Sequence, residues 1–268
     1  MNTLAKLAVR LIKKVLEKRI PSKAINHIIA YSQYQEDNGI VEGGVHRSDI
    51  KQEGSMAVST HYRCINTLQE EEVYSVDKEN KNIKIIDNNF TNESGDLDFK
   101  GNNYIELPNF IHESKFQYAP VMMKRLVLYL FSLGTKDSYA NVKCSTLQKV
   151  LHLNRPEKVF DLLRVLDQKG WFYIERDINK EGEFKFHFKL KNVYAGTSRL
   201  KHNKKQENKV KQIFRRKKIE WNPKELADFV QLLNQYKDNF FNCLKYLTQQ
   251  TAKGNIFRGI ICKHIAYN

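Results

Sequence analysis

The sequence lacks the residue patterns on which most enzymes and metal proteins depend. Its four cysteines lie too far apart for a CxxC pair, and it contains neither an HExxH motif nor an acidic metal cluster. It has no GxxxxGK[ST] loop, which argues against an ATPase. The eight histidines form no His-apolar-His pair beside a strand, which argues against a nicking enzyme. We therefore expect no enzymatic activity, no metal and no cofactor.

Long apolar runs and paired cysteines are both missing. No run of about eighteen apolar residues occurs, so we expect no membrane span. The cysteines are Cys64, Cys144, Cys243 and Cys262, and three of them lie inside apolar helical patterns. This usage indicates reduced core thiols in a cytoplasmic protein rather than a disulfide framework.

Basic residues are abundant, and their excess lies at the two ends of the chain. The 268 residues carry a net charge of +15, which favours a polyanionic partner such as nucleic acid or an acidic membrane surface. Residues 1–20 hold six Lys or Arg against one acidic residue, and residues 195–268 hold sixteen against five. The middle of the chain is close to neutral, which does not exclude DNA binding because affinity depends on local phosphate contacts.

The first twenty residues predict an amphipathic basic helix. Its apolar face is formed by Leu4, Leu7, Leu11, Val15 and Leu16. We expect that face to dock on the rest of the protein or on a second copy, and binding to a membrane surface is the alternative. The segment has no cleavage site of the kind found in secretory signals.

Two stretches of the chain predict the same order of elements. In the first, a helix over 22–35 and a short helix over 47–54 precede a helix that begins near residue 56, and strands 74–76 and 83–86 flank a polar turn. In the second, a short strand near 104 and a helix over 120–133 precede helices 145–153 and 154–170, and strands 172–175 and 184–190 follow. Helices followed by a hairpin are the order of a winged helix-turn-helix domain.

A constant offset of 98 residues relates the two stretches. The first has apolar-type positions at His61, Ile65, Leu68 and Val73, and the second at Val159, Leu163, Leu166 and Trp171. A short helix precedes each set and a polar-tipped hairpin follows each, which favours two copies of one architecture.

The segment STHYRCINTLQEEEV, residues 59–73, resembles the recognition helix of many bacterial winged-helix regulators. The tandem arrangement over about residues 20–192 resembles the replication initiator proteins of plasmids and phages, which carry two winged-helix domains. The chain departs from the pattern at His61, where a buried aliphatic residue is usual. It departs again at Glu72, which replaces the glycine before the wing that Gly170 keeps in the second copy.

The resemblance implies an α+β, mostly α fold with two winged helix-turn-helix domains and a small C-terminal helical unit. The expected divisions are an amphipathic helix at 1–20, a first domain at 21–90, a linker at 91–103, a second domain at 104–194, a basic linker at 195–219 and a helical interaction module at 220–268. The basic segment 198–218 holds ten Lys or Arg and one acidic residue. It can be a flexible linker or a helix on phosphates, with a polybasic membrane segment as the alternative.

Candidate DNA contacts come from both recognition helices, both wings and the basic segment. In the first domain they are Ser59, Thr60, Tyr62 and Arg63, with wing lysines Lys78, Lys81 and Lys84. In the second domain they are Asn154, Arg155, Lys158 and Arg164, with wing lysines Lys180, Lys185 and Lys189. In the basic segment they are Lys204, Lys205, Arg215 and Arg216.

Within this set we expect the second helix to supply most of the affinity and the first to supply part of the sequence preference. Asn154 is predicted to cap the second helix. The run Glu70, Glu71 and Glu72 lies at the end of the first helix that leaves the groove. The alternative for either helix is that it packs in a dimer interface.

Our hypothesis is a sequence-specific, double-stranded DNA-binding protein that acts as a replication initiator. It would bind repeated origin sites and recruit a helicase or helicase loader through its C-terminal helices. The alternatives are a transcriptional repressor or activator that binds an operator as a dimer, and an adaptor whose winged helices make only protein contacts.

Overall fold

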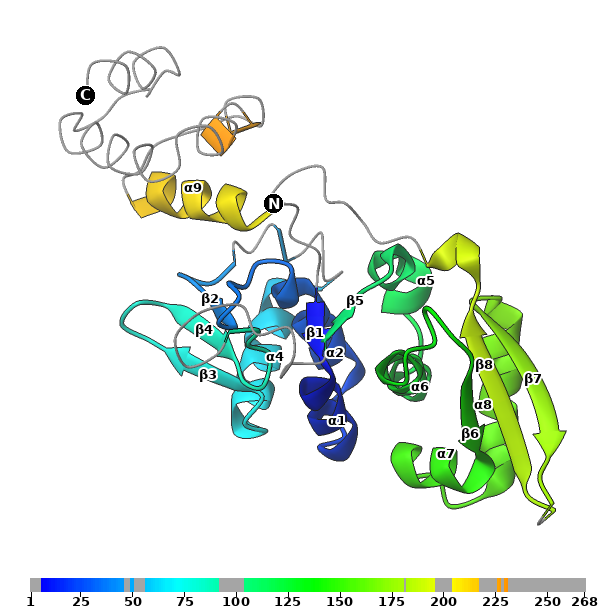
Figure 1. Ribbon diagram of the computed structural model, residues 1–268. Helices are drawn as coiled ribbons and strands as arrows, with labels where there is room; N and C mark the ends of the chain where they lie inside the picture. Colours follow the sequence, from blue (N-terminus) through cyan, green and yellow to red (C-terminus); the bar gives the residue numbers. More distant parts are fainter. Residues whose placement is uncertain are drawn as a thin grey trace. The chain divides into compact units, whose positions relative to one another are not determined.

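The computed structural model describes residues 6–45, 49–50, 56–91, 104–180, 182–195, 204–216, 226–227 and 229–230 (Figure 1). The chain divides into two compact units, one within Leu4–Arg199 and one within Leu200–Asn268 together with Met1–Thr3. Both helices and small antiparallel sheets are present, so the protein is a helix-rich α+β protein, as the sequence predicts.

The first lobe of the larger unit covers residues 21–91. Its elements are α2 (Ser22–Ser32), β2 (Ile40–Val41), α4 (Val58–Glu70), β3 (Tyr74–Asp77) and β4 (Asn82–Ile85). The strands form an antiparallel sheet in the order β2-β4-β3. Asp49 and Ile50 are helical, and the rest of the short helix predicted over 47–54 lies outside the described residues.

The second lobe covers residues 104–195. It begins with β5 (Tyr104–Glu106), the 3-10 helix η1 (Asn109–His112) and α5 (Ser114–Gln117). It continues with α6 (Val121–Ser132), β6 (Ala140–Lys143), α7 (Cys144–Leu151), α8 (Pro156–Lys169), β7 (Phe172–Ile178), β8 (Phe184–Leu190) and η2 (Asn192–Tyr194). Its antiparallel sheet has the order β6-β8-β7, so the last strand lies in the middle, as in the first lobe.

Burial in the two lobes follows the 98-residue offset predicted from the sequence. Three of the four predicted pairs are buried in both lobes, namely His61, Leu68 and Val73 in the first and Val159, Leu166 and Trp171 in the second. In the fourth pair Leu163 is buried and Ile65 is half-buried. Helical spacing places the helical members of each set on one face of the last helix of the lobe. The last member of each set lies at the start of the hairpin that follows, so each set packs the helix against the hairpin.

The turn from helix to hairpin has the same backbone conformation in both lobes. Glu72 has φ +56° and Gly170 has φ +70°, and both residues come directly before the buried residue that opens the hairpin. Glycine adopts this left-handed conformation readily, whereas a residue with a Cβ adopts it at a cost. The departure from the glycine pattern at Glu72 therefore reflects a side chain at a strained position rather than a different turn.

The N-terminal segment differs from the single helix predicted over residues 1–20. Lys6–Ala8 form strand β1, which pairs antiparallel with β5, and α1 (Val9–Glu17) begins only after it. The backbone N–H of Ala8 donates to the Asn88 Oδ1 atom at 2.7 Å. The strand partner lies almost a hundred residues away, so helical spacing of the leucines alone could not reveal it.

The apolar face of α1 lies inside the larger unit. Leu11, Ile12, Val15 and Leu16 are buried, and the helix contacts α6 and α7 of the second lobe. Docking on the rest of the protein is therefore confirmed for this face. The residues of this face that the structure describes therefore leave no apolar surface free for a membrane.

A buried lysine joins α2 of the first lobe to α6 of the second. The Lys124 side chain has no solvent exposure, and its Nζ donates to the Asn26 Oδ1 atom and to the Gln117 carbonyl, each at 2.7 Å. It also donates to the Ser22 Oγ atom at 2.8 Å. All three partners are neutral, and burial lowers the pKa of Lys124 to about 7.

Three other details of the fold differ from the sequence prediction. Strands β2 and β6 were not predicted, since two and four residues are too few to show a clear alternation of apolar and polar side chains. The prediction that Asn154 caps α8 is wrong. Arg155 is the N-cap residue, and no side-chain cap hydrogen bond is present.

The C-terminal unit contains α9 (Lys204–Arg216), so the helical form of the basic segment holds for these residues. Val210 and Phe214 are buried, and the Phe214 ring lies 4.9 Å from the Phe229 ring, edge to face. Residues 226–227 and 229–230 are helical. The other helices predicted over 220–268 lie outside the described residues, as do residues 92–103 of the predicted linker.

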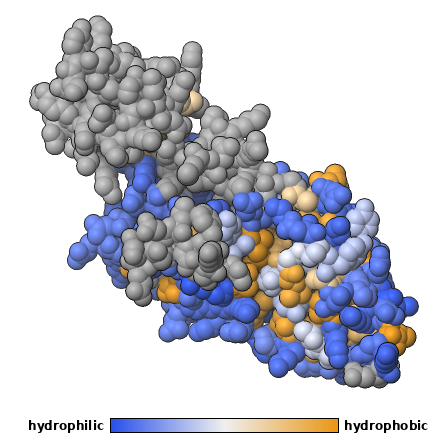
Figure 2. Space-filling model, viewed as in Figure 1, coloured by the Kyte–Doolittle hydropathy of each residue, from blue (hydrophilic) through white to orange (hydrophobic). Residues whose placement is uncertain are grey.

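The face shown in Figure 2 is mostly hydrophilic, with apolar residues in scattered patches. In the described part of the chain, no helix combines the length and the apolar character that a membrane span requires.

Candidate nucleic-acid interface

Helix α4 carries the first set of candidate DNA contacts on its outer face. Ser59, Tyr62 and Arg63 are exposed, and Thr60 is half-buried. On the inner face His61, Cys64 and Leu68 are buried, since they recur at helical spacing. All four predicted residues lie in the N-terminal half of the helix, and three of them are available to a ligand.

A network of buried polar side chains packs against the inner face of α4. The Tyr74 hydroxyl lies 3.0 Å from His27 Nδ1, and His27 Nε2 lies 2.9 Å from His61 Nδ1. The Tyr31 ring stacks on His27 at a centroid distance of 4.3 Å. His61 was predicted to face the core, and it does, but its partner His27 was missed because it lies on a different helix.

Burial tunes the ionisable groups of this network toward their neutral forms. Burial lowers the pKa of His27 well below its usual value, and the neighbouring His61 lowers it further. The pKa of His61 is also lowered by burial. Burial raises the pKa of Cys64 on the same helix to about 11, which favours the protonated thiol at neutral pH.

Helix α8 and the two residues before it carry the second set of candidates. Asn154, Arg155, Lys158 and Arg164 are all exposed. The exposed surface of the helix also contains the acidic residues Glu157, Asp161 and Asp167, which the sequence reasoning left out of the second interface. Arg164 Nη1 lies 3.5 Å from Asp161 Oδ1, and both side chains are about 70% exposed, so this ion pair contributes little to stability.

The hairpin lysines occupy two kinds of position. Lys78 and Lys81 are exposed in the turn between β3 and β4, and Lys180 is exposed in the turn between β7 and β8. Lys185 instead lies within β8, opposite Lys143 of β6 and Asp177 of β7. Lys84 and Lys189 also lie inside strands rather than at hairpin tips.

The tip of the first hairpin is ordered by Asp77. Its Oδ1 atom accepts the backbone N–H groups of Glu79 at 3.0 Å and Asn80 at 3.1 Å, and its Oδ2 atom accepts the Asn80 side-chain amide. These hydrogen bonds, the Asn80 side chain first, lower the pKa of the Asp77 carboxyl. A fixed turn presents Lys78 and Lys81 without a large ordering cost.

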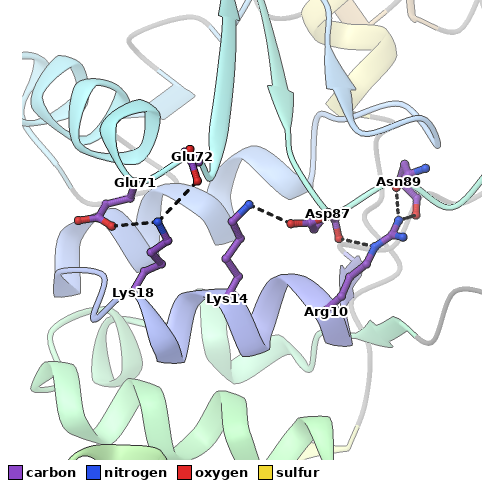
Figure 3. Close-up of polar contacts among 7 residues, drawn as sticks. All are labelled: Arg10, Lys14, Lys18, Glu71, Glu72, Asp87 and Asn89. Atoms are coloured by element: carbon purple, nitrogen blue, oxygen red, sulfur yellow. Dashed lines mark hydrogen bonds and ion pairs between the residues drawn. The ribbon is translucent and has the colours of Figure 1, made fainter.

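The basic face of α1 is engaged within the protein (Figure 3). Lys18 Nζ lies 3.9 Å from Glu71 Oε2 and 3.7 Å from Glu72 Oε2, and Lys14 Nζ lies 3.0 Å from Asp87 Oδ2. Arg10 donates to the Asp87 and Asn89 carbonyls and to the Asn89 side chain.

These contacts tie the acidic end of α4 to α1. Glu71 and Glu72, two of the three glutamates that follow the recognition residues, therefore have a cationic partner within the protein, Lys18. Spacing of Arg10, Lys14 and Lys18 at four-residue steps is the sequence signal that could have indicated such a stripe.

The remaining candidates lie on α9 in the C-terminal unit. Lys204, Lys205, Arg215 and Arg216 fall within this helix, and Arg215 is exposed. Lys211 Nζ lies 2.7 Å from Glu207 Oε1, one turn away. The structure thus places the predicted residues on two helices and two hairpins of the larger unit and on one helix of the other.

Comparisons with protein-family models, with curated proteins and with solved structures find no match to this chain. Among the described residues, no group of three or more His, Cys, Asp or Glu side chains is placed to hold a metal ion.

Proposed function

We propose that this protein is a cytoplasmic, sequence-specific, double-stranded DNA-binding protein with two winged helix-turn-helix domains. The observation that supports it best is the order of helix, strand, last helix and hairpin that the described residues of both lobes share, with the same sheet order in each lobe. In domains of this kind the last helix enters the major groove and the hairpin contacts the phosphate backbone or the minor groove.

The side chains on α4 fit this role. Arg63 can donate two hydrogen bonds to one guanine edge, and Ser59 can donate to or accept from either base type. Tyr62 is 59% exposed beside them, so its ring and hydroxyl are accessible to a partner. Lys78 and Lys81 on the ordered hairpin tip supply phosphate contacts.

As a replication initiator, the protein would bind repeated origin sites and recruit a helicase or helicase loader through its C-terminal unit. In that unit Val210, Phe214 and Phe229 form a small apolar core. This core holds the apolar face of α9 in place. The alternative of the same DNA-binding class is a dimeric transcription regulator.

Selection of bound fragments from random duplex DNA, followed by footprinting, tests this proposal. An initiator protects several short direct repeats and binds them as a monomer or a cooperative array. One protected inverted repeat would favour the dimeric regulator, because a two-fold axis in the protein is mirrored in its site. No enrichment of any duplex sequence would contradict sequence-specific binding altogether.

A further inference from the structure

The outer face of the second sheet carries an aromatic and basic surface, of which the candidate duplex contacts include only Lys185 and Lys189. Strand alternation places Phe186, Phe188 and Leu190 of β8 in the core, so their neighbours point outward. The outward side chains are Tyr139, Asn141, Lys143, Tyr173, Glu175, Asp177, Lys185, His187, Lys189 and Lys191, which together we term the outer sheet face.

One row of this face holds a lysine between two tyrosines. Lys189 pairs directly with Tyr173 of β7, and the β6 register places Tyr139 on its other side. Tyr139 is 46% exposed and Tyr173 is 49% exposed. Lys189 Nζ lies 5.5 Å from the Tyr139 ring centroid, and Lys191 Nζ lies 5.3 Å from the Tyr173 ring centroid.

The next row can supply polar contacts to a base. His187 lies between Asn141 and Glu175, and its Nδ1 atom is hydrogen-bonded to the Asn141 side chain. Further along, Lys185 faces Asp177, and Lys143 forms an ion pair with Glu183 at 3.4 Å. The uncompensated positive charge is therefore greatest beside the two tyrosines, at Lys189 and Lys191.

The first lobe provides an internal comparison. At the equivalent row, Lys84 of β4 pairs with Ser75 on one side and with Ile40 on the other. The central lysine is present in both lobes, but the two flanking aromatic rings occur only in the second. Folding of the sheet therefore does not require tyrosines at this row.

We propose that the outer sheet face binds single-stranded nucleic acid, with bases stacked on Tyr139 and Tyr173 and phosphates held by Lys189 and Lys191. Aromatic side chains on an open sheet surface stack bases in this way, and lysines follow the backbone. A duplex keeps its bases inside the stack, so these rings have nothing to stack on there.

The spacing of the rings agrees with an extended strand. Tyr139 and Tyr173 lie two strand positions apart, which is roughly 10 Å. Bases in a duplex strand follow one another every ~3.4 Å. We therefore expect the bases on the two rings to belong to an extended strand whose bases are no longer stacked on one another. This inference does not rest on duplex binding, which uses α4 and α8.

The test uses the full chain, a fluorescent oligothymidine and a duplex of the same length. Tyr173→Ser places the first-lobe residue at this position, and Tyr139→Ala removes the other ring. We expect each variant to bind the single strand about tenfold more weakly, and its affinity for the duplex to be unchanged. Lys189→Ala should lower the salt dependence of single-strand binding by about 0.7 in log–log slope.

Lys84→Ala is the matched control, since it removes the equivalent lysine from the sheet without tyrosines. It should leave single-strand affinity unchanged, and thermal melting should show that every variant is folded. The proposal is overturned if the wild-type chain does not bind the oligothymidine, or if the tyrosine variants bind it normally. It is also overturned if Lys84→Ala weakens single-strand binding equally, or if duplex affinity falls in parallel. If the wild-type chain binds the single strand but binds no duplex, only the proposed function is contradicted.

Discussion

Glu72 adopts a left-handed backbone conformation despite its side chain, as do four other non-glycine residues in the described part of the chain. It has a φ of +56° where the second lobe has Gly170, and its carboxylate forms only an exposed contact with Lys18. Glu72→Gly should raise the free energy of unfolding by about 0.5–1 kcal/mol, because relief of the left-handed strain exceeds the loss of a weak ion pair. Urea unfolding measures the change. Gly170→Ala should have the opposite sign, and destabilisation by both variants would show that the Lys18 contact outweighs the strain.

The buried His27 and His61 pair predicts acid sensitivity. Burial lowers both pKa values, so the unfolded chain binds protons below about pH 6.5 that the folded chain does not bind. The free energy of unfolding should therefore fall as the pH drops from 7 toward 5. The double variant His27→Leu/His61→Val, with the valine that the second lobe has at this position, should lose part of that slope. Urea unfolding at pH 7 and at pH 5 measures the free energy of unfolding of each protein. The same change with pH in the wild-type chain and in the double variant would contradict this account.

Lys124 predicts a trend of the same sign at alkaline pH, where stability should also increase with pH. Burial lowers its pKa to about 7, so above pH 7 the unfolded chain retains a proton that the folded chain has lost. The free energy of unfolding should rise between pH 7 and pH 9, relative to Lys124→Met, which has no proton to lose. The comparison with this variant cancels the titration of other groups. A difference between the two proteins that does not change with pH would show that the amine stays charged in the folded state.

At the scale of elements, long helices could be predicted from the sequence, whereas pairings between distant segments could not. The buried spacing of Val159, Leu163 and Leu166 placed α8, and the polar turn between two apolar runs placed the β3–β4 hairpin. Strand β1 was missed because its partner β5 lies almost a hundred residues away. For the same reason the candidate site was only partly visible, since the acidic partners of α1 come from the end of α4 and from beyond β4.

Helix α1 has a structural role that its basic composition conceals. Leu11 is fully buried on the face of α1 that contacts α6 and α7, so Leu11→Ala should lower the free energy of unfolding by about 2–5 kcal/mol. Lys13, two residues away and exposed, is the matched control, and Lys13→Ala should change the free energy by less than about 0.5 kcal/mol. Urea unfolding followed by circular dichroism gives both values. A small effect of Leu11→Ala would mean that α1 is not part of the core.

At the scale of the whole molecule, charge and architecture together support nucleic-acid binding. Residues 21–194 are close to neutral in sum, but the exposed faces of α4 and α8 and the hairpin tips bring cations to the surface in each lobe. Lys14 and Lys18 of the basic N-terminal segment are engaged with acidic partners, and α9 carries cations in the C-terminal unit. Counting charges along the sequence could not distinguish cations that stabilise the fold from those that face a ligand.

The most direct test of duplex binding is its salt dependence, measured on a selected duplex between about 50 and 200 mM salt. The wild-type affinity should fall linearly in a log–log plot, and the slope should decrease by about 1 for each phosphate contact removed in Arg155→Ala/Lys158→Ala/Arg164→Ala. Lys13→Ala should retain the wild-type slope. An affinity that does not depend on salt, or a triple variant with the wild-type affinity and slope, would contradict binding of duplex DNA through α8.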